Sequence, residues 1–349
     1  MNVLLAIVAL GVLIFIHELG HFLASRAVRV PVQEFALGFG PAILRYRGKE
    51  TLYRFNVIPF GGYVRFFEAG DPPASDGSSA VPYRPDPDRF FTARPVWEKV
   101  VITAAGVIGN FALAVAVFAL VGTPALSKHA YIMKVFPSSL AAKADLHPGD
   151  KVLTINGQTA DSPQRVVQII QRSPSQVTFR LERGGRVLTR SSAKAYPTER
   201  LGIMVGQTMI FQRSGNPLLD LADGFRQTWI LVGQILHGLG RLFTSRSGFN
   251  QVTGPVGVVQ VTAGAARQGP GFLAYFVAII SIQLGIVNLL PIPGLDGGHL
   301  LIFGIEALKR RPLNPARVGW VNLMGILLLL TFMVAVTFRD IARLLKISG

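Results

Sequence analysis

The first residues with a recognisable chemical spacing are two histidines and a glutamate near the start of the chain. His17 and His21 lie four residues apart, with Glu18 directly after the first of them. On a helix, positions i and i+4 face the same side, so both imidazoles can bind one metal ion. Glu18 then lies where its carboxylate can hold and deprotonate a water molecule. The pattern predicts a hydrolytic metal site with His17 and His21 as ligands and Glu18 as the base.

The alternative to a metal site is a pair of buried histidines that hydrogen-bond to neighbouring helices. The motif lies inside an apolar stretch, residues 3–24, where three ionisable groups are costly and usually mark a functional site. Because the chain has no cysteine, thiolate ligands and disulfides are excluded. A metal must use His, Asp or Glu, and the type of motif favours zinc over iron or cobalt.

A catalytic zinc site usually has three protein ligands and leaves a fourth position open. Asp296 is the only acidic residue between positions 272 and 303. It lies in the segment 288–299, where Pro291, Pro293 and three glycines interrupt a helix. Irregular backbone at membrane depth is tolerated where it is buried or lines a wet cavity. Asp296 is therefore the predicted third ligand; the alternatives are a helix N-cap role for it and His299 as a rival ligand.

Long apolar segments must position these side chains. The 349 residues are 50% hydrophobic and 15% charged, with a mean hydropathy of +0.42, which favours a membrane protein. The first apolar segment resembles a signal peptide, but it lacks a basic leading region and a cleavage site, so we predict that it is retained. Four segments are long enough to cross a bilayer, at 3–24, 100–121, 272–290 and 318–336.

The net charge of +16 is not arranged as a nucleic-acid surface, because no basic run is interleaved with aromatic residues. Nucleic acid is therefore not an expected partner, whereas the lipid bilayer with anionic headgroups is. Lys and Arg gather between the first two apolar segments and between positions 309 and 317. By the positive-inside rule both loops are predicted to be cytoplasmic, with the long central region on the opposite side.

The first of these loops, 31–99, is predicted to be a membrane-associated β-hairpin region. Apolar and polar residues alternate at 43–47 and 51–58 around a Gly-Lys turn, and a further short strand is predicted at 63–67. Residues 69–88 are rich in Pro, Ser, Asp and Gly and predict a loop.

The central region, 126–206, is predicted to be a soluble, β-rich insert. Within it, residues 147–157 resemble the strand-and-turn core of a PDZ domain, although another small β-rich domain would also fit. An amphipathic helix is predicted at 218–243, either in the membrane interface or as a fifth span. The insert's predicted elements are strands at 131–136, 151–155, 176–181 and 186–190 and a helix at 163–171.

Taken in order, these motifs resemble those of site-2 proteases, and most closely the bacterial regulator of sigma-E proteases. The resemblance rests on the histidine motif, the Pro-Phe-Gly-Gly-Tyr-Val sequence at 59–64, Gly106 with Asn110, the insert, and the segment 288–297. It covers essentially the whole chain. Two departures are that many relatives carry two PDZ domains, whereas this chain has room for one, and that Val107 stands where the family often has Pro.

The resemblance implies a polytopic α-helical membrane protein with about four transmembrane helices, a cytoplasmic β-hairpin region and one inserted PDZ-like β-rich domain. The implied location is the bacterial inner membrane, with the active site near the cytoplasmic side and the insert on the periplasmic or outer side. The implied parts are a first transmembrane helix at 1–30, the hairpin region at 31–99, a second helix at 100–122, the insert at 126–206, an amphipathic helix and linker at 214–271, a third helix at 272–308, and a fourth helix with the tail at 318–349.

The implied activity is that of a zinc metalloendopeptidase that cuts single-span membrane proteins, such as anti-sigma factors or signal-peptide remnants. The insert is implied to bind peptide C-termini or to restrict access. A helical substrate must unwind before attack, and the strands around 53–55 and 63–67 offer edges for β-addition. For Asn288, a polar contact between helices is an equally good interpretation. The expected substrate contacts are Asn288, Pro291, Pro293, Gly61, Gly62 and Tyr63.

Two other functions compete with this one. A metal or proton-coupled transporter would also place His and Asp within membrane spans, but transporters commonly contain internal repeats and none is evident here. A non-catalytic membrane adaptor would bind peptides through the insert and use the metal structurally. Glu18 argues against the adaptor, because a structural site has no need of a base.

Overall fold

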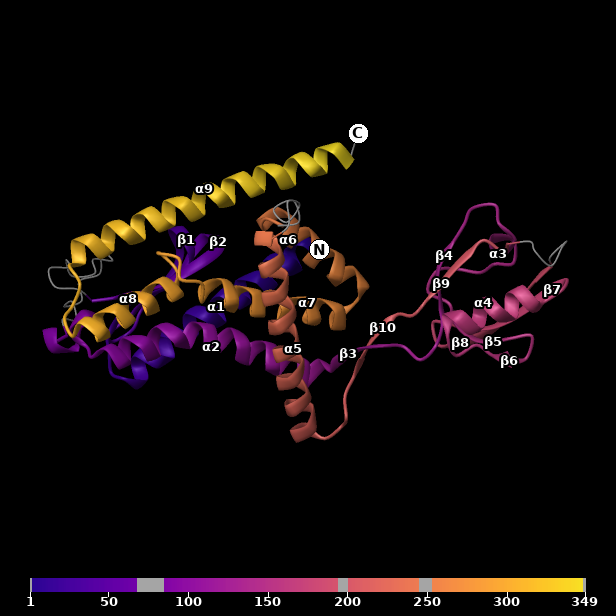
Figure 1. Ribbon diagram of the computed structural model, residues 1–349, viewed down its shortest axis with the longest axis horizontal. Helices are drawn as coiled ribbons and strands as arrows, with labels where there is room; N and C mark the ends of the chain where they lie inside the picture. The colour runs from indigo at the N-terminus through magenta and orange to yellow at the C-terminus, as the bar shows by residue number, and fades with distance from the viewer. Residues whose placement is uncertain (1, 68–84, 194–199, 245–252, 348–349) are drawn as a thin grey trace. The chain divides into compact units, whose positions relative to one another are not determined.

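The computed structural model describes residues 2–67, 85–193, 200–244 and 253–347 (Figure 1). The chain forms two compact units: Met1–Gly122 together with Arg213–Gly349, and Thr123–Gln212. Most of the loop predicted at 69–88 lies outside the described residues.

Four helices of the first unit are long and apolar enough to cross a membrane. They are α1 (Asn2–Ala27), α2 (Val96–Val121), α7 (Pro270–Asn288) and the Pro315–Arg343 part of α9 (Pro315–Ile347). They match the four apolar segments of the sequence, so the prediction of four spans is confirmed within the described residues. The protein is a multi-pass membrane protein.

The third predicted segment, 272–308, is not one continuous helix. Helix α7 ends at Asn288 and α8 (Asp296–Lys309) begins after an irregular turn of seven residues, 289–295. Pro291 and Pro293 have no backbone N–H to continue the helical ladder, and Gly294 has a φ of +90°. The break brings the first residue of α8 back toward the middle of the helical unit.

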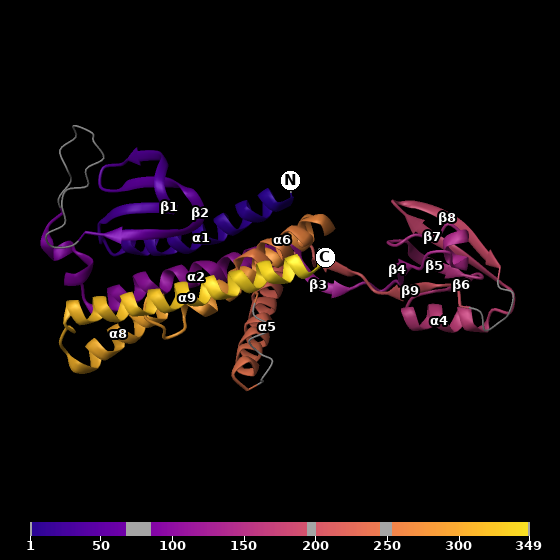
Figure 2. The same cartoon turned by 90° about the horizontal axis from the view of Figure 1, so that it is seen from above.

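Helix α2 is the centre of this unit, and it packs against α1, α5 (Pro217–Thr244), α7 and α8. Helix α5 crosses the bundle steeply (Figures 1 and 2) and buries Leu231 and Val232 against α2 and α7. The residue range of α5 includes the whole of the amphipathic segment predicted at 218–243. A further helix, α6 (Pro255–Gln268), occupies part of the predicted linker and packs against α1, α7 and α9.

Two long bent strands form a sheet beside α1. They are β1 (Val32–Arg47) and β2 (Leu52–Phe66), so β1 begins well before the strand predicted at 43–47, and β2 joins the two strands predicted at 51–58 and 63–67. The register gives four arms in the order 62–66, 32–37, 52–55 and 44–47. Two short 3₁₀ turns, Pro87–Arg89 and Phe91–Ala93, precede α2.

The arm order corrects one prediction about this sheet. Residues 53–55 are paired on both sides: Arg54, for example, lies opposite both Ala36 and Arg45. This arm therefore offers no free edge for β-addition. Within the described residues, the arm 62–66 pairs on one side only, with the first part of β1, and its other side remains available as an edge.

The second unit is a β-sheet with two helices. Its main sheet has the strand order β8-β7-β5-β4-β9, and β6 pairs with β5. The predicted strands and helix are all present, whereas β3, β6, β9, β10 and α3 were not predicted. The elements are β3 (Thr123–Leu126), β4 (Tyr131–Val135), α3 (Leu140–Lys143), β5 (Lys151–Ile155), β6 (Gln158–Thr159), α4 (Pro163–Arg172), β7 (Gln176–Arg183), β8 (Arg186–Ala193), β9 (Ile203–Gly206) and β10 (Met209–Gln212).

An apolar core and one buried ion pair hold this unit together. Ile132, Val152, Phe179 and other apolar side chains are fully buried between the sheet and the helices. Asp150 is also fully buried, and Arg183 donates two hydrogen bonds to its carboxylate, at 2.6 and 2.8 Å. Burial raises the pKa of Asp150, but the Arg183 hydrogen bonds, the His147 N–H and the guanidinium charge outweigh it, so the pKa lies below its ordinary value.

Candidate metal centre

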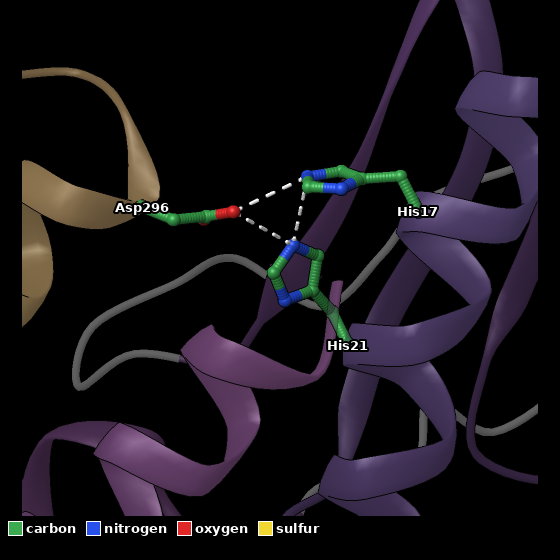
Figure 3. Close-up of side chains that lie close together, drawn as sticks. All are labelled: His17, His21 and Asp296. Carbon is green, nitrogen blue, oxygen red and sulfur yellow. Dashed lines mark hydrogen bonds and ion pairs between the residues drawn. The ribbon is translucent and has the colours of Figure 1, made fainter. Parts of the chain in front are cut away.

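The two motif histidines lie on one face of α1, as their spacing predicts. Their rings are perpendicular, with centroids 4.8 Å apart, and their Nε2 atoms are 3.2 Å apart (Figure 3). Helix α1 is predominantly apolar, so the two imidazoles are polar groups in an apolar span. Their Nε2 atoms point toward the same place.

Asp296 approaches the histidines from the start of α8 (Figure 3). Its Oδ2 lies 3.2 Å from His17 Nε2 and 3.5 Å from His21 Nε2. Apart from these two rings, this buried oxygen accepts no hydrogen bond from the described residues. The N-cap of α8 is Leu295, with no side-chain capping bond, so Asp296 is not an N-cap.

Two glycines after Asp296 allow this approach. A Cβ on Gly297 would lie 2.3 Å from the carbonyl oxygens of Leu289 and Leu290, and one on Gly298 would lie 2.3 Å from the Ile292 oxygen. The irregular turn between α7 and α8 therefore packs directly onto the first turn of α8. A larger residue at position 297 or 298 would prevent this contact. This close packing aims the Asp296 carboxylate at α1.

The donor set and its spacing fit zinc. Zinc binds His nitrogen and carboxylate oxygen in tetrahedral geometry at bond lengths of about 2.1 Å, which separates two donors by about 3.4 Å. The three donor-to-donor distances here are 3.2, 3.2 and 3.5 Å. Among the described residues, His17, His21 and Asp296 are the group whose ligand atoms converge in this way. Three protein ligands also leave the fourth position open, as a catalytic site requires.

Helix α2 supplies the contacts behind both imidazoles. His21 Nδ1 lies 2.9 Å from the Ile102 carbonyl oxygen, so this nitrogen donates and Nε2 keeps its lone pair. A Cβ on Gly106 would lie 2.3 Å from His21 Nε2 and 2.9 Å from His17 Cε1, so both rings need a glycine there. One turn further along, the Asn110 amide lies 3.1 Å from His17 Nδ1.

The three convergent side chains line a cavity of about 660 Å³. Glu18, the predicted base, lines the same cavity. The ring of Phe91 stacks on Phe66 at 4.7 Å between centroids and meets Phe303 at 6.1 Å, and all three rings belong to the cavity wall. The cavity therefore combines polar groups at one place with apolar walls that suit a hydrophobic chain.

The other predicted site residues divide into two groups. Gly61, Gly62, Tyr63 and Asn288 line the cavity, and the Asn288 amide nitrogen lies 3.3 Å from His17 Nε2. Pro291 and Pro293 do not belong to the lining formed by the described residues.

His299 lines the cavity without joining the three convergent side chains. Its ring lies beside Phe303, with centroids 6.2 Å apart. The geometry therefore favours Asp296 over His299 as the third ligand.

The sequence did not predict the positions of Ile102, Gly106 and Asn110 behind the histidines. A signal was present, because Asn110 is a polar residue in an apolar span and such residues are costly unless they serve a purpose. The contact with His17 joins residues 93 positions apart, which periodicity within one helix cannot reveal.

Comparison with known proteins gives the same chemistry. Residues 5–332 match the model of peptidase family M50. The chain is 29% identical to the zinc metalloprotease RasP of Geobacillus kaustophilus, over 97% of both chains. It is 28% identical to the zinc metalloprotease RasP of Bacillus licheniformis, over 99% of this chain and 100% of that one. It is also 35% identical to slr1821 of Synechocystis sp., a zinc metalloprotease by prediction, over 99% of this chain and 96% of that one.

These relatives favour hydrolysis over the transporter and the non-catalytic adaptor. The family match covers the histidine motif and Asp296, includes two of the four membrane-spanning helices completely, and includes most of the other two. A cluster of two histidines and an aspartate with zinc-like spacing, carried by apolar helices, is the expected centre of a membrane-embedded zinc metalloendopeptidase. The chain belongs to peptidase family M50, the site-2 protease family.

Proposed function

We propose that His17, His21 and Asp296 hold the zinc ion and that the enzyme hydrolyses peptide bonds in or near the transmembrane segments of single-span membrane proteins. The observation that carries this proposal is the convergence of the three ligand atoms, all within 4.8 Å of one another, at a cavity lined by α1, α7 and α8. A site in this position reaches substrates that are themselves in the membrane.

Glu18 is the proposed general base. Zinc supplies Lewis-acid chemistry here, which activates water at neutral pH and polarises the substrate carbonyl. Glu18 follows His17 directly and lines the same cavity, so its carboxylate can take a proton from the attacking water. It then returns that proton to the nitrogen of the leaving amine.

The arm 62–66 of β2 is the proposed guide for the substrate backbone. Gly61, Gly62 and Tyr63 line the cavity, and the arm is paired on one side only within the described residues. An unwound segment can add to this edge by main-chain hydrogen bonds. Asn288 also lines the cavity, and its amide can bind the same segment.

Pro291 and Pro293 are proposed to act on substrate indirectly. Neither belongs to the cavity lining formed by the described residues, but both end the helical path between Asn288 and Asp296. They therefore determine the positions of the Asn288 amide and the Asp296 carboxylate. Direct contact with substrate is not required of them.

The second unit is proposed to be a PDZ-like domain that receives peptide C-termini. Strand β9 is at the end of its sheet and α4 packs next to it, so a peptide can add to the free edge of β9 beside the helix. Gly202, directly before β9, has a φ of +73°, and such turns present backbone N–H groups that can bind a carboxylate. Such a domain would admit substrates that have already been trimmed.

The proposed location is the bacterial inner membrane, with the metal centre near the cytoplasmic side and the second unit on the periplasmic side. The distribution of Lys and Arg in the loops next to α1, α2 and α9 supports this orientation. The proposed role is regulated intramembrane proteolysis, such as cleavage of anti-sigma factors or signal-peptide remnants.

The direct test is proteolysis by the purified full-length chain in detergent or vesicles. Candidate single-span membrane proteins are incubated with the enzyme, with and without a chelator, and then after zinc is added back. We expect cleavage within or next to the transmembrane segment that stops with the chelator and returns with zinc. Cleavage that persists after complete removal of metal would refute the proposal.

A further inference from the structure

The contact between Asn110 and His17 determines which nitrogen of His17 can bind a metal. Asn110 is fully buried in α2, and its amide nitrogen lies 3.1 Å from His17 Nδ1. In this orientation the amide donates to Nδ1, and the ring proton must then lie on Nε2. Nε2 is the atom that faces Asp296 and His21, so a proton there would exclude a metal ion.

The same orientation leaves the other end of the amide without a partner. Asn110 Oδ1 is buried and accepts no hydrogen bond from the described residues. A half-turn of the amide exchanges the nitrogen and the oxygen within the same volume. The oxygen then lies at hydrogen-bond distance from His17 Nδ1.

We infer that Asn110 is a positioning residue for zinc: its side-chain oxygen accepts the Nδ1–H of His17 and so keeps the Nε2 lone pair free for the metal. His21 already has the equivalent arrangement, because its Nδ1 donates to the Ile102 carbonyl at 2.9 Å. Ile102, Gly106 and Asn110 follow one another at intervals of four along one face of α2. The first supplies an acceptor, the second leaves space for both rings, and the third supplies the second acceptor.

This inference rests on the proposed zinc centre and adds a role for α2. Outer partners of metal-binding histidines fix the ring orientation and tautomer, and their loss typically lowers metal affinity 10–100-fold. Asn110 is held in place independently of the metal, because Ser281 Oγ donates a 2.8 Å hydrogen bond to its backbone oxygen. The side-chain amide is therefore available to form a hydrogen bond with His17 alone.

The test compares Asn110→Asp with Asn110→Leu in the full-length enzyme. A carboxylate can only accept at neutral pH, so Asn110→Asp keeps the proposed hydrogen bond, whereas leucine has a similar size and no acceptor. The zinc dissociation constant is measured by competition with a chromogenic chelator after the resident metal has been removed. We expect wild-type or tighter zinc binding in Asn110→Asp and binding about 10–100-fold weaker in Asn110→Leu.

Ser281→Ala is the matched control, because it removes a buried hydrogen bond beside Asn110 without touching the amide. Its zinc affinity should equal that of the wild type. The inference is overturned if Asn110→Leu binds zinc within twofold of the wild type, or if Asn110→Asp binds it as weakly as Asn110→Leu. If leucine prevents folding, the aspartate variant still decides, because an amide that donates to His17 could not be replaced by a carboxylate without loss of affinity.

The measured ratio separates this inference from the proposed function. If the wild-type enzyme binds zinc but cuts no membrane protein, the proposed function fails and the ratio of affinities still stands. If the enzyme cuts its substrates but the two Asn110 variants bind zinc equally, only the inference fails.

Discussion

At the scale of single residues, the proposed chemistry depends on three donors that come from distant parts of the chain. His17 and His21 share a helix, whereas Asp296 comes from a different helix and reaches them at 3.2 and 3.5 Å. The histidines were predictable, because four-residue spacing on a helix fixes their common face. The choice between Asp296 and His299 was not, because both lie in one irregular segment whose course depends on how Gly297 and Gly298 pack.

Substitution of the two candidate third ligands, Asp296 and His299, should affect zinc content differently. Asp296→Asn replaces a carboxylate by a neutral amide, which is a weaker ligand, so zinc content after dialysis and proteolysis should both fall. His299→Ala should retain its zinc, because the His299 ring is outside the convergent group. Metal analysis of both purified variants checks this. Full zinc in Asp296→Asn together with empty His299→Ala would transfer the role of ligand to His299.

At the scale of elements, the spans and four strands of the second unit, β4, β5, β7 and β8, were predictable from hydropathy and alternation. The order of arms in the sheet of β1 and β2 was not. The sequence shows that 53–55 and 63–67 are strands, but only the register shows that the former is internal and the latter is at an edge. Similarly, α8 begins as a separate helix because of the Pro291–Pro293 turn, whose direction the sequence does not specify.

Because α1 and α2 approach closely at Gly106, the addition of one methyl group there should strongly lower zinc affinity. Gly106→Ala would place a Cβ 2.3 Å from His21 Nε2, so the rings must move and zinc affinity should fall at least tenfold. Gly11→Ala is the control in α1, where a Cβ meets nothing within 4 Å. Zinc competition titrations on the two variants make the comparison. Equal affinities would show that the helices can separate without cost to the metal centre.

The ion pair in the second unit predicts a pH-dependent stability. Asp150→Asn removes the charge that Arg183 contacts and should destabilise the unit by about 1–3 kcal/mol at neutral pH. The folded pKa of Asp150 lies below 3.8, so its contribution is complete above that value and is lost as the pH falls further. Hydrogen exchange of β5 and β7 in the full-length chain is the measurement, with the exposed Asp161→Asn as control.

If Asp150→Asn and Asp161→Asn leave exchange equally unchanged at neutral pH, the ion pair has no net effect on stability. A difference from wild type that persists undiminished well below pH 3.8 would contradict the assignment of that difference to the ionised carboxylate.

At the scale of the whole molecule, the proposed function assigns catalysis to the first unit and substrate selection to the second. All three proposed ligands and Glu18 belong to the first unit, and none lies between Thr123 and Gln212. The resemblance to site-2 proteases predicted this division, because the insert interrupts the chain between two spans. Periodicity alone predicts a β-rich insert, and the proposal that the insert filters substrates comes from the resemblance.

Excising the second unit should therefore separate selectivity from chemistry. Strands β3 and β10 pair antiparallel, and the Ser127 N–H donates to the Thr208 oxygen at 2.8 Å, so a two-residue Asn-Gly turn can replace residues 128–207. Zinc content should be unchanged. Full-length substrates that the intact enzyme refuses should now be cut as readily as trimmed ones. If the zinc-loaded variant keeps the wild-type preference, the unit is not the filter.

The central claim is that Glu18 activates water at a zinc centre held by His17, His21 and Asp296. Glu18→Gln keeps all three ligands and removes the base, so zinc content and turnover of one membrane substrate should be measured on the same sample. We predict full zinc occupancy with the cleavage rate lowered by about 10²–10⁴-fold, the usual contribution of a general base. A Glu18→Gln enzyme that contains zinc and cuts at the wild-type rate would contradict the role of Glu18 as the general base.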